Sequence, residues 1–203
     1  MQWGIECFRS TDRTACNRQR AFTLIELMIV VAIVGVLAVL AVYGVRKYLA
    51  NAKSAEARNS LGQIAKDAAT AVEREKGMTA ILGSGTLSAP LRAFCGTAAN
   101  TVPTQMSAVQ GKKYQSQKTD WGSADTPLTG WQCLKFSLEE PQYYEYEYTA
   151  TNTSPSPNTG GFTANAHGDL NGDGVLSTFM VQGSAQNGVI AISPNIQETN
   201  PEE

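Results

Sequence analysis

A single carboxylate, Glu26, stands near the start of a long apolar stretch, and its chemistry is the first feature of this sequence that needs an explanation. The residues that follow, Leu27–Val45, carry no formal charge and can cross the hydrocarbon core of a bilayer as one helix. A carboxylate beside such a segment costs free energy unless it is paired. Cleavage between Ala21 and Phe22 would create an α-amino group about one helical turn before Glu26. We therefore predict an N-terminal ammonium group as its counter-ion; an ordinary membrane anchor with an interfacial Glu is the simpler alternative.

The residues around Glu26 resemble a known signal. A basic leader, the small residue Ala21 and the run FTLIELMIVVAIVGVLA that begins at Phe22 are similar to the class III signal of type IV pilins and of the pseudopilins of type II secretion. The segment from Tyr43 to Arg58 resembles the major pilins of myxobacterial, gliding-type bacteria. This second likeness favours a type IVa major pilin over a pseudopilin.

The resemblance implies a processing route and an assembly role. A prepilin peptidase would cleave between Ala21 and Phe22, and the new amino group of Phe22 would be methylated. Glu26 would then pair with the N-terminus of a neighbouring subunit in a fibre. Two positions depart from the family pattern: Ala21 stands where Gly is usual, and Tyr43 stands where many pilins have a helix-bending Pro.

We expect the apolar run to continue as an amphipathic helix. Apolar residues recur at helical spacing at Leu61, Ile64, Ala65, Ala68 and Val72. The helix is therefore predicted to extend from Phe22 to about Lys76 and to end at Gly77, a residue type typical of helix C-termini. The organisation that we expect is a cleaved leader at 1–21, a transmembrane or fibre-core half-helix at 22–45, an amphipathic half-helix at 46–76, a connecting loop at 77–130 and a β-sheet head at 131–203.

The head is predicted to be a small antiparallel sheet, because short apolar or alternating runs follow one another with turn residues between them. The predicted strands are 131–138, 142–149, 161–166, 176–183 and 189–192. In the second of them Tyr144, Tyr146 and Tyr148 alternate with glutamates, so one face is aromatic. That face is expected to pack on the helix; a carbohydrate-binding strip is the alternative. The fold class is α+β, the type IV pilin fold, in which a long N-terminal helix packs on the sheet.

Cysteine usage separates the leader from the head. Cys7 and Cys16 would leave with the leader, whereas Cys95 and Cys133 remain and allow only one internal pairing. Because the resemblance implies export to an oxidising compartment, we predict a disulfide between Cys95 and Cys133. Two buried free thiols are the alternative.

One loop has the opening pattern of a calcium site. Asp169, Asn171 and Asp173 alternate before a glycine, as in D-x-N-x-D-G loops that present oxygen ligands to Ca²⁺. The position of the bidentate Glu holds Met180 instead, so an Asx-rich turn between strands explains the pattern equally well. Ca²⁺ is thus a candidate ligand, and no cofactor is required. His167 is interpreted as structural.

Charge and motifs exclude several classes of function. The formal net charge is −2, and removal of the leader makes it more negative, so a general nucleic-acid surface is not expected. A local contact would be limited to Lys112–Lys113 or Lys118, which we interpret as solvated loop residues. The sequence contains no catalytic signature that we identify, so an enzyme is not predicted.

These observations lead to one main hypothesis. The chain is expected to be the major pilin of a retractile type IV pilus that serves twitching or social motility and adhesion. Its partners would be copies of itself, a prepilin peptidase and N-methyltransferase, an inner-membrane assembly platform and minor pilins, with a surface polysaccharide as a candidate ligand. It would be a single-pass inner-membrane protein before assembly and an extracellular fibre afterwards. The alternatives are a pseudopilin of type II secretion and, from another class, a membrane-tethered calcium-dependent binding domain.

Overall fold

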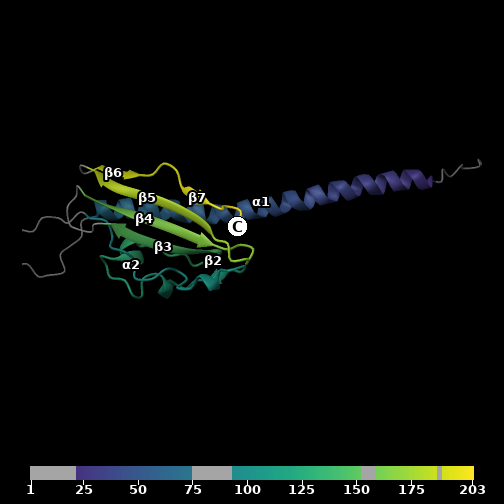
Figure 1. The fold of residues 1–203 in the computed structure, drawn as a ribbon. Helices are drawn as coiled ribbons and strands as arrows, with labels where there is room; N and C mark the ends of the chain where they lie inside the picture. The colour runs from purple at the N-terminus through teal and green to yellow at the C-terminus, as the bar shows by residue number, and fades with distance from the viewer. Residues whose placement is uncertain (1–21, 75–92, 152–158, 187–188) are drawn as a thin grey trace, which may run out of the picture. The chain divides into compact units, whose positions relative to one another are not determined.

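The computed structural model describes residues 22–74, 93–151, 159–186 and 189–203 (Figure 1). The chain divides into two units, residues 1–43 and 44–203.

The first unit is the beginning of a long helix, α1, which spans Leu24–Glu73. All of its large apolar side chains up to Tyr43 are exposed, at 53% or more of their surface. Among the described residues, α1 is long and apolar enough to cross a membrane. Signal sequences also meet these criteria of length and composition. Within the described residues the large apolar side chains of this segment are exposed, and its role as a transmembrane or fibre-core half-helix stays a prediction.

The second unit contains the remainder of α1 and an antiparallel sheet. The sheet consists of β3 (Tyr144–Thr151), β4 (Thr159–Gly168), β5 (Ser177–Gln186) and β6 (Val189–Ile192), paired in that order, and β7 (Gln197–Thr199) pairs with β5 beside β6. In Figure 1 the second half of α1 runs along one face of this sheet. The result is the predicted α+β arrangement, a type IV pilin-like fold.

Four of the five predicted strands are present, and one prediction is wrong. The segment 131–138 begins instead with a short helix, α2, at Gly130–Leu134. Its start is fixed by Asp125, whose carboxylate accepts a hydrogen bond from the backbone N–H of Trp131 at 2.8 Å. Its end is Lys135 in the left-handed conformation, with φ at 64°. A carboxylate six residues before Trp131 and an unusual backbone angle at Lys135 thus override the local strand propensity.

The described part of the connection between α1 and the sheet contains small ordered elements. These are two 3₁₀ turns at Met106–Ala108 and Lys118–Asp120 and a two-stranded pairing of β1 (Tyr114–Gln115) with β2 (Pro141–Gln142). The predicted helix end at Gly77 lies outside the described residues, and α1 ends at Glu73. The strand β7 had not been predicted.

The core lies between α1 and the sheet. The buried positions of α1 in it include Ala57, Leu61, Ile64, Ala68 and Val72. From the sheet, Tyr144, Tyr146 and Tyr148 contribute fully buried rings. These tyrosines are therefore packing residues, as expected from the alternation, and the carbohydrate-strip alternative is wrong because no part of the three rings is exposed.

Candidate processing and assembly site

The start of α1 holds the carboxylate that the sequence singled out. The backbone N–H and the hydroxyl of Thr23 both donate to Oε2 of Glu26, at 2.8 and 2.9 Å. In return the backbone N–H of Glu26 donates to the hydroxyl of Thr23 at 3.3 Å. This reciprocal pattern is a capping box, in which the N-cap side chain and the third helical residue satisfy each other's backbone groups. Glu26 is thus held at the first turn of α1, where the helix dipole also stabilises a negative charge.

The sequence reasoning missed Thr23, although the signal was readable. The spacing T-x-x-E immediately before an apolar helix is the sequence form of a capping box. The structure therefore gives Glu26 an internal partner in addition to the N-terminal ammonium group that we predict. Phe22, which precedes the cap, is 87% exposed. Ala21 lies outside the described residues.

Comparison with known proteins bears on this region alone. The sequence model of the prokaryotic N-terminal methylation motif matches residues 16–42. The chain carries a type IV pilin-like N-terminal signal. Such a signal is typical of a prepilin peptidase substrate that works with a pilus-type assembly machinery, and with the apolar helix it fits anchoring in the inner membrane before assembly. No curated protein and no solved structure matches the chain.

The disulfide expected from the sequence is present in the head. Cys95 and Cys133 are joined, with their Cα atoms 5.7 Å apart. Both residues are buried, and the backbone carbonyl of Cys95 accepts a hydrogen bond from the hydroxyl of Tyr148 at 3.4 Å. The bond links the start of the connecting segment to α2. Cys7 and Cys16 lie outside the described residues.

The loop between β4 and β5 contains the three candidate calcium ligands. The carboxylate of Asp169 accepts hydrogen bonds from the backbone N–H groups of Gly172 and Gly174, at 2.6 and 2.9 Å. Burial alone would raise the pKa of this carboxyl, but the backbone donors outweigh it and the pKa is lowered. Asn171 and Asp173 accept from backbone N–H groups two residues further on, as in Asx turns.

These contacts show which groups organise the loop. Each of the three oxygen-bearing side chains serves the loop's own backbone. Within the ranges that the structure describes, no group of three or more His, Cys, Asp and Glu side chains is arranged to hold a metal ion. Calcium at Asp169, Asn171 and Asp173 stays a prediction.

His167 lies on the outward face of β4 and contacts its neighbours across the sheet. Its Nδ1 atom is 3.1 Å from the hydroxyl of Thr178, and its Nε2 atom is 4.0 Å from Oε2 of Glu147. Burial lowers the pKa of the imidazole, and the nearby carboxylate of Glu147 opposes that shift. These contacts are those of a residue within a sheet.

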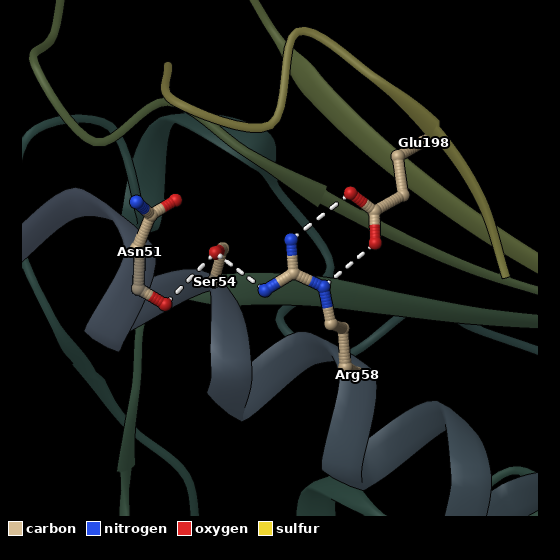
Figure 2. A network of polar contacts seen from close by, with 4 residues as sticks. All are labelled: Asn51, Ser54, Arg58 and Glu198. Atoms are coloured by element: carbon tan, nitrogen blue, oxygen red, sulfur yellow. Dashed lines mark hydrogen bonds and ion pairs between the residues drawn. The ribbon is translucent and has the colours of Figure 1, made fainter. Parts of the chain in front are cut away.

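A polar network joins α1 to the C-terminal strand (Figure 2). The guanidinium of Arg58 donates to both carboxylate oxygens of Glu198, at 2.6 and 2.9 Å, and also to the hydroxyl of Ser54 at 3.0 Å. Ser54 in turn donates to the backbone carbonyl of Asn51 at 3.0 Å. The pKa of Glu198 is lowered, chiefly by its hydrogen bond from Arg58. Sequence reasoning missed this pair because its members are 140 residues apart.

Two lysines lie over one tyrosine ring near the same part of α1. The ammonium groups of Lys53 and Lys113 are 4.8 and 4.5 Å from the centre of the Tyr143 ring. The backbone N–H of Tyr143 donates to Glu56 at 2.9 Å. Lys113, considered above as a local nucleic-acid contact, is thus engaged with an aromatic ring and lies close enough to lower the pKa of Glu56, which burial raises.

Proposed function

We propose that this chain is the major structural subunit of a retractile type IV pilus, polymerised through α1. The observation that carries the proposal is the exposed apolar surface from Phe22 to Tyr43. Phe22, just before α1, is 87% exposed, and Leu24, its first residue, is 75% exposed. The methylation motif matches the same region. Such a surface is stable in a bilayer, or, outside one, against copies of itself. A helical bundle of subunits satisfies the second condition, because every copy presents the same surface.

The site at the helix start suits this assembly. Cleavage between Ala21 and Phe22 would place a methylated ammonium group next to Glu26. In the apolar centre of a bundle the carboxylate needs a partner, and the N-terminus of a neighbouring subunit supplies one. The capping box with Thr23 supports Glu26 before this exchange.

The partners and location follow from this role. The prepilin would be a substrate of a prepilin peptidase and N-methyltransferase in the inner membrane. An assembly platform and minor pilins would start the fibre, and its extension and withdrawal would serve surface motility and adhesion. A surface polysaccharide is the candidate ligand of the extracellular fibre.

A pseudopilin of a type II secretion system is the second candidate. The same signal and the same exposed helix support it equally well. The two functions differ in where the polymer ends, because pseudopilins form short periplasmic assemblies. Extracellular fibres made of this chain would therefore separate them.

The first experiment is intact mass measurement and N-terminal sequencing of protein sheared from expressing cells. A chain that begins at N-methyl-Phe22 and lacks two hydrogens, because of the disulfide, supports a pilin. Recovery of the protein only from membranes, with residues 1–21 attached, contradicts fibre assembly. Recovery of the processed chain only from the periplasm favours the pseudopilin.

A matched pair of variants separates the two partners of Glu26. Glu26→Ala removes both the capping contact and the carboxylate that would pair with the N-terminal ammonium group. Fibres should therefore be lost while the protein still enters the membrane. Thr23→Val removes only the hydroxyl contact and should leave most fibres, counted by electron microscopy. Equal loss in both variants would mean that Glu26 acts through the cap alone.

A further inference from the structure

The packing of α1 on the head changes character at Ser60. From Leu61 to Val72 its buried side chains are all apolar. From Asn51 to Ser60 the buried side chains are instead Ser54, Ala57 and Ser60, two of them polar and all of them small. We call Asn51–Ser60 the latch segment and Leu61–Val72 the anchor segment.

The latch segment is held mainly by polar contacts. Arg58 pairs with Glu198, Glu56 accepts from the backbone of Tyr143, and Lys53 lies over the Tyr143 ring. The side chains of Arg58 and Glu198 are 35% and 30% exposed, so water and salt weaken their attraction. About one helical turn before the latch segment, the ammonium group of Lys47 is 3.0 Å from the carboxylate of Glu202, and both side chains are about half exposed. Arg58 also lies over the buried ring of Phe179, 5.3 Å from its centre. The two ion pairs can be exchanged for water at a small cost in free energy.

The sheet surface opposite the latch segment contains polar groups that burial leaves unsatisfied. Among the residues that the structure describes, the hydroxyls of Tyr144 and Tyr146 are buried without a partner at hydrogen-bond distance. Burial raises the pKa of Tyr144 to about 12 and also raises the pKa of Tyr146, and the nearby hydroxyls of Ser177 and Ser60 oppose these two shifts. Each orphaned group would regain a hydrogen bond if water entered here.

We propose that the latch segment is a releasable contact, which opens from the head while the anchor segment stays packed. Opening exchanges exposed ion pairs for solvated ions and gives the buried hydroxyls water as a partner. On α1 it uncovers only small side chains, and on the sheet it exposes part of the rings of Tyr144 and Tyr146. Opening at the anchor segment would instead expose Leu61 and Ile64, both fully buried, at the full hydrophobic cost. Local opening starts where the cost is lowest. The C-terminal strand β7, which carries Glu198, is expected to loosen with the latch.

The inference goes beyond the proposed function and does not depend on it. It gives the head a built-in freedom of movement around residues 51–60 of α1. In a polymer that is pulled or repacked, this contact would yield before the core does.

Cysteine accessibility tests the proposal in the full chain in detergent micelles, with Cys7→Ser and Cys16→Ser to remove the leader thiols. Ala57→Cys reports on the latch segment and Ala68→Cys on the anchor segment; both alanines are fully buried on α1. We expect a maleimide to label the first at least about tenfold faster than the second. Adding Glu198→Gln should speed labelling at 57 by about three- to fivefold and leave 68 unchanged.

Controls make each outcome decisive. Glu73→Gln removes a carboxylate from an exposed position of α1 and should change neither rate. Sodium chloride at high concentration should accelerate labelling at 57 only. Equal rates at the two positions, or equal acceleration of both by Glu198→Gln, would show that the head opens as a whole and would overturn the proposal. If either alanine variant fails to fold, judged by circular dichroism, Ser54→Cys and Ala65→Cys repeat the comparison.

Discussion

The two parts of α1, before and after Tyr43, have the same backbone but different burial. The first part exposes all of its large apolar side chains, whereas the second buries one face against the sheet. A helix that is apolar all round needs a partner outside its own chain, and an amphipathic helix needs only its own head. In the proposed function, one continuous helix thus serves assembly with its first half and folding with its second.

The similarity to known proteins is also confined to the first of these two parts. The matched methylation motif covers residues 16–42, in the first unit, and nothing in the head matches a curated protein or a solved structure. In the proposed function the first unit meets a peptidase, a membrane and copies of itself, and each of these contacts would restrict its residue types. The head has to fold and present a surface, which many sequences can do.

Removal of the disulfide, which belongs to the second unit alone, should have the largest effect and tests whether the two units are independent. Cys133→Ser should lower the free energy of unfolding of the head by about 4 kcal/mol, because the bond closes a loop of sequence separation 38. Urea unfolding followed by fluorescence of the buried Trp121 and Trp131 measures this loss. Membrane insertion, measured by carbonate extraction, should not change. A variant that also fails to insert would mean that the helix depends on the head.

Sequence reasoning succeeded where a physical period decides the structure. The apolar run, the helical spacing from Leu61 to Val72 and the alternating tyrosines of β3 are local patterns, and the structure contains the elements that they predict. The Cys95–Cys133 pairing followed from two cysteines in a head for which the resemblance implies export.

It failed where no apolar period marks the structure. α2 depends on the nearby carboxylate of Asp125 and on the left-handed Lys135. β7 is a three-residue strand placed by its pairing with the distant β5. The pairing of Arg58 with Glu198 joins the middle of α1 to the end of the chain, and no local pattern encodes it. The capping role of Thr23 was encoded locally and could have been found.

A matched pair of leucine substitutions sharpens the comparison within α1. Leu61→Ala removes a fully buried side chain and should destabilise the head by about 3 kcal/mol, through lost burial and the cavity left behind. Leu37→Ala removes the same atoms from a side chain that is 59% exposed, and should leave head stability unchanged. Urea unfolding measures both. A comparable loss in Leu37→Ala would show that the first part of α1 also packs on the head.

The smallest expected effect concerns the second half of α1 and depends on pH. Arg58 lowers the pKa of Glu198 below its ordinary value of 4.5, so this pair stabilises the folded head above about that pH. The contribution is about 1 kcal/mol or less, since both side chains are partly exposed, and it should disappear as the pH falls through the folded-state pKa.

Glu198→Gln isolates this contribution, because the other titrating groups, including Glu56, are shared by both proteins. At pH 7 the variant should be less stable than the parent in urea unfolding, and the two curves should converge as the pH falls through the lowered pKa of Glu198. The direction of the difference is informative in itself. A group with a raised pKa, such as Glu56, destabilises the folded state at neutral pH and would give the opposite trend. A difference that stays constant as the pH is lowered until the folded head begins to unfold would mean that Glu198 acts through packing and not through its charge, so that the latch would not respond to ionic conditions.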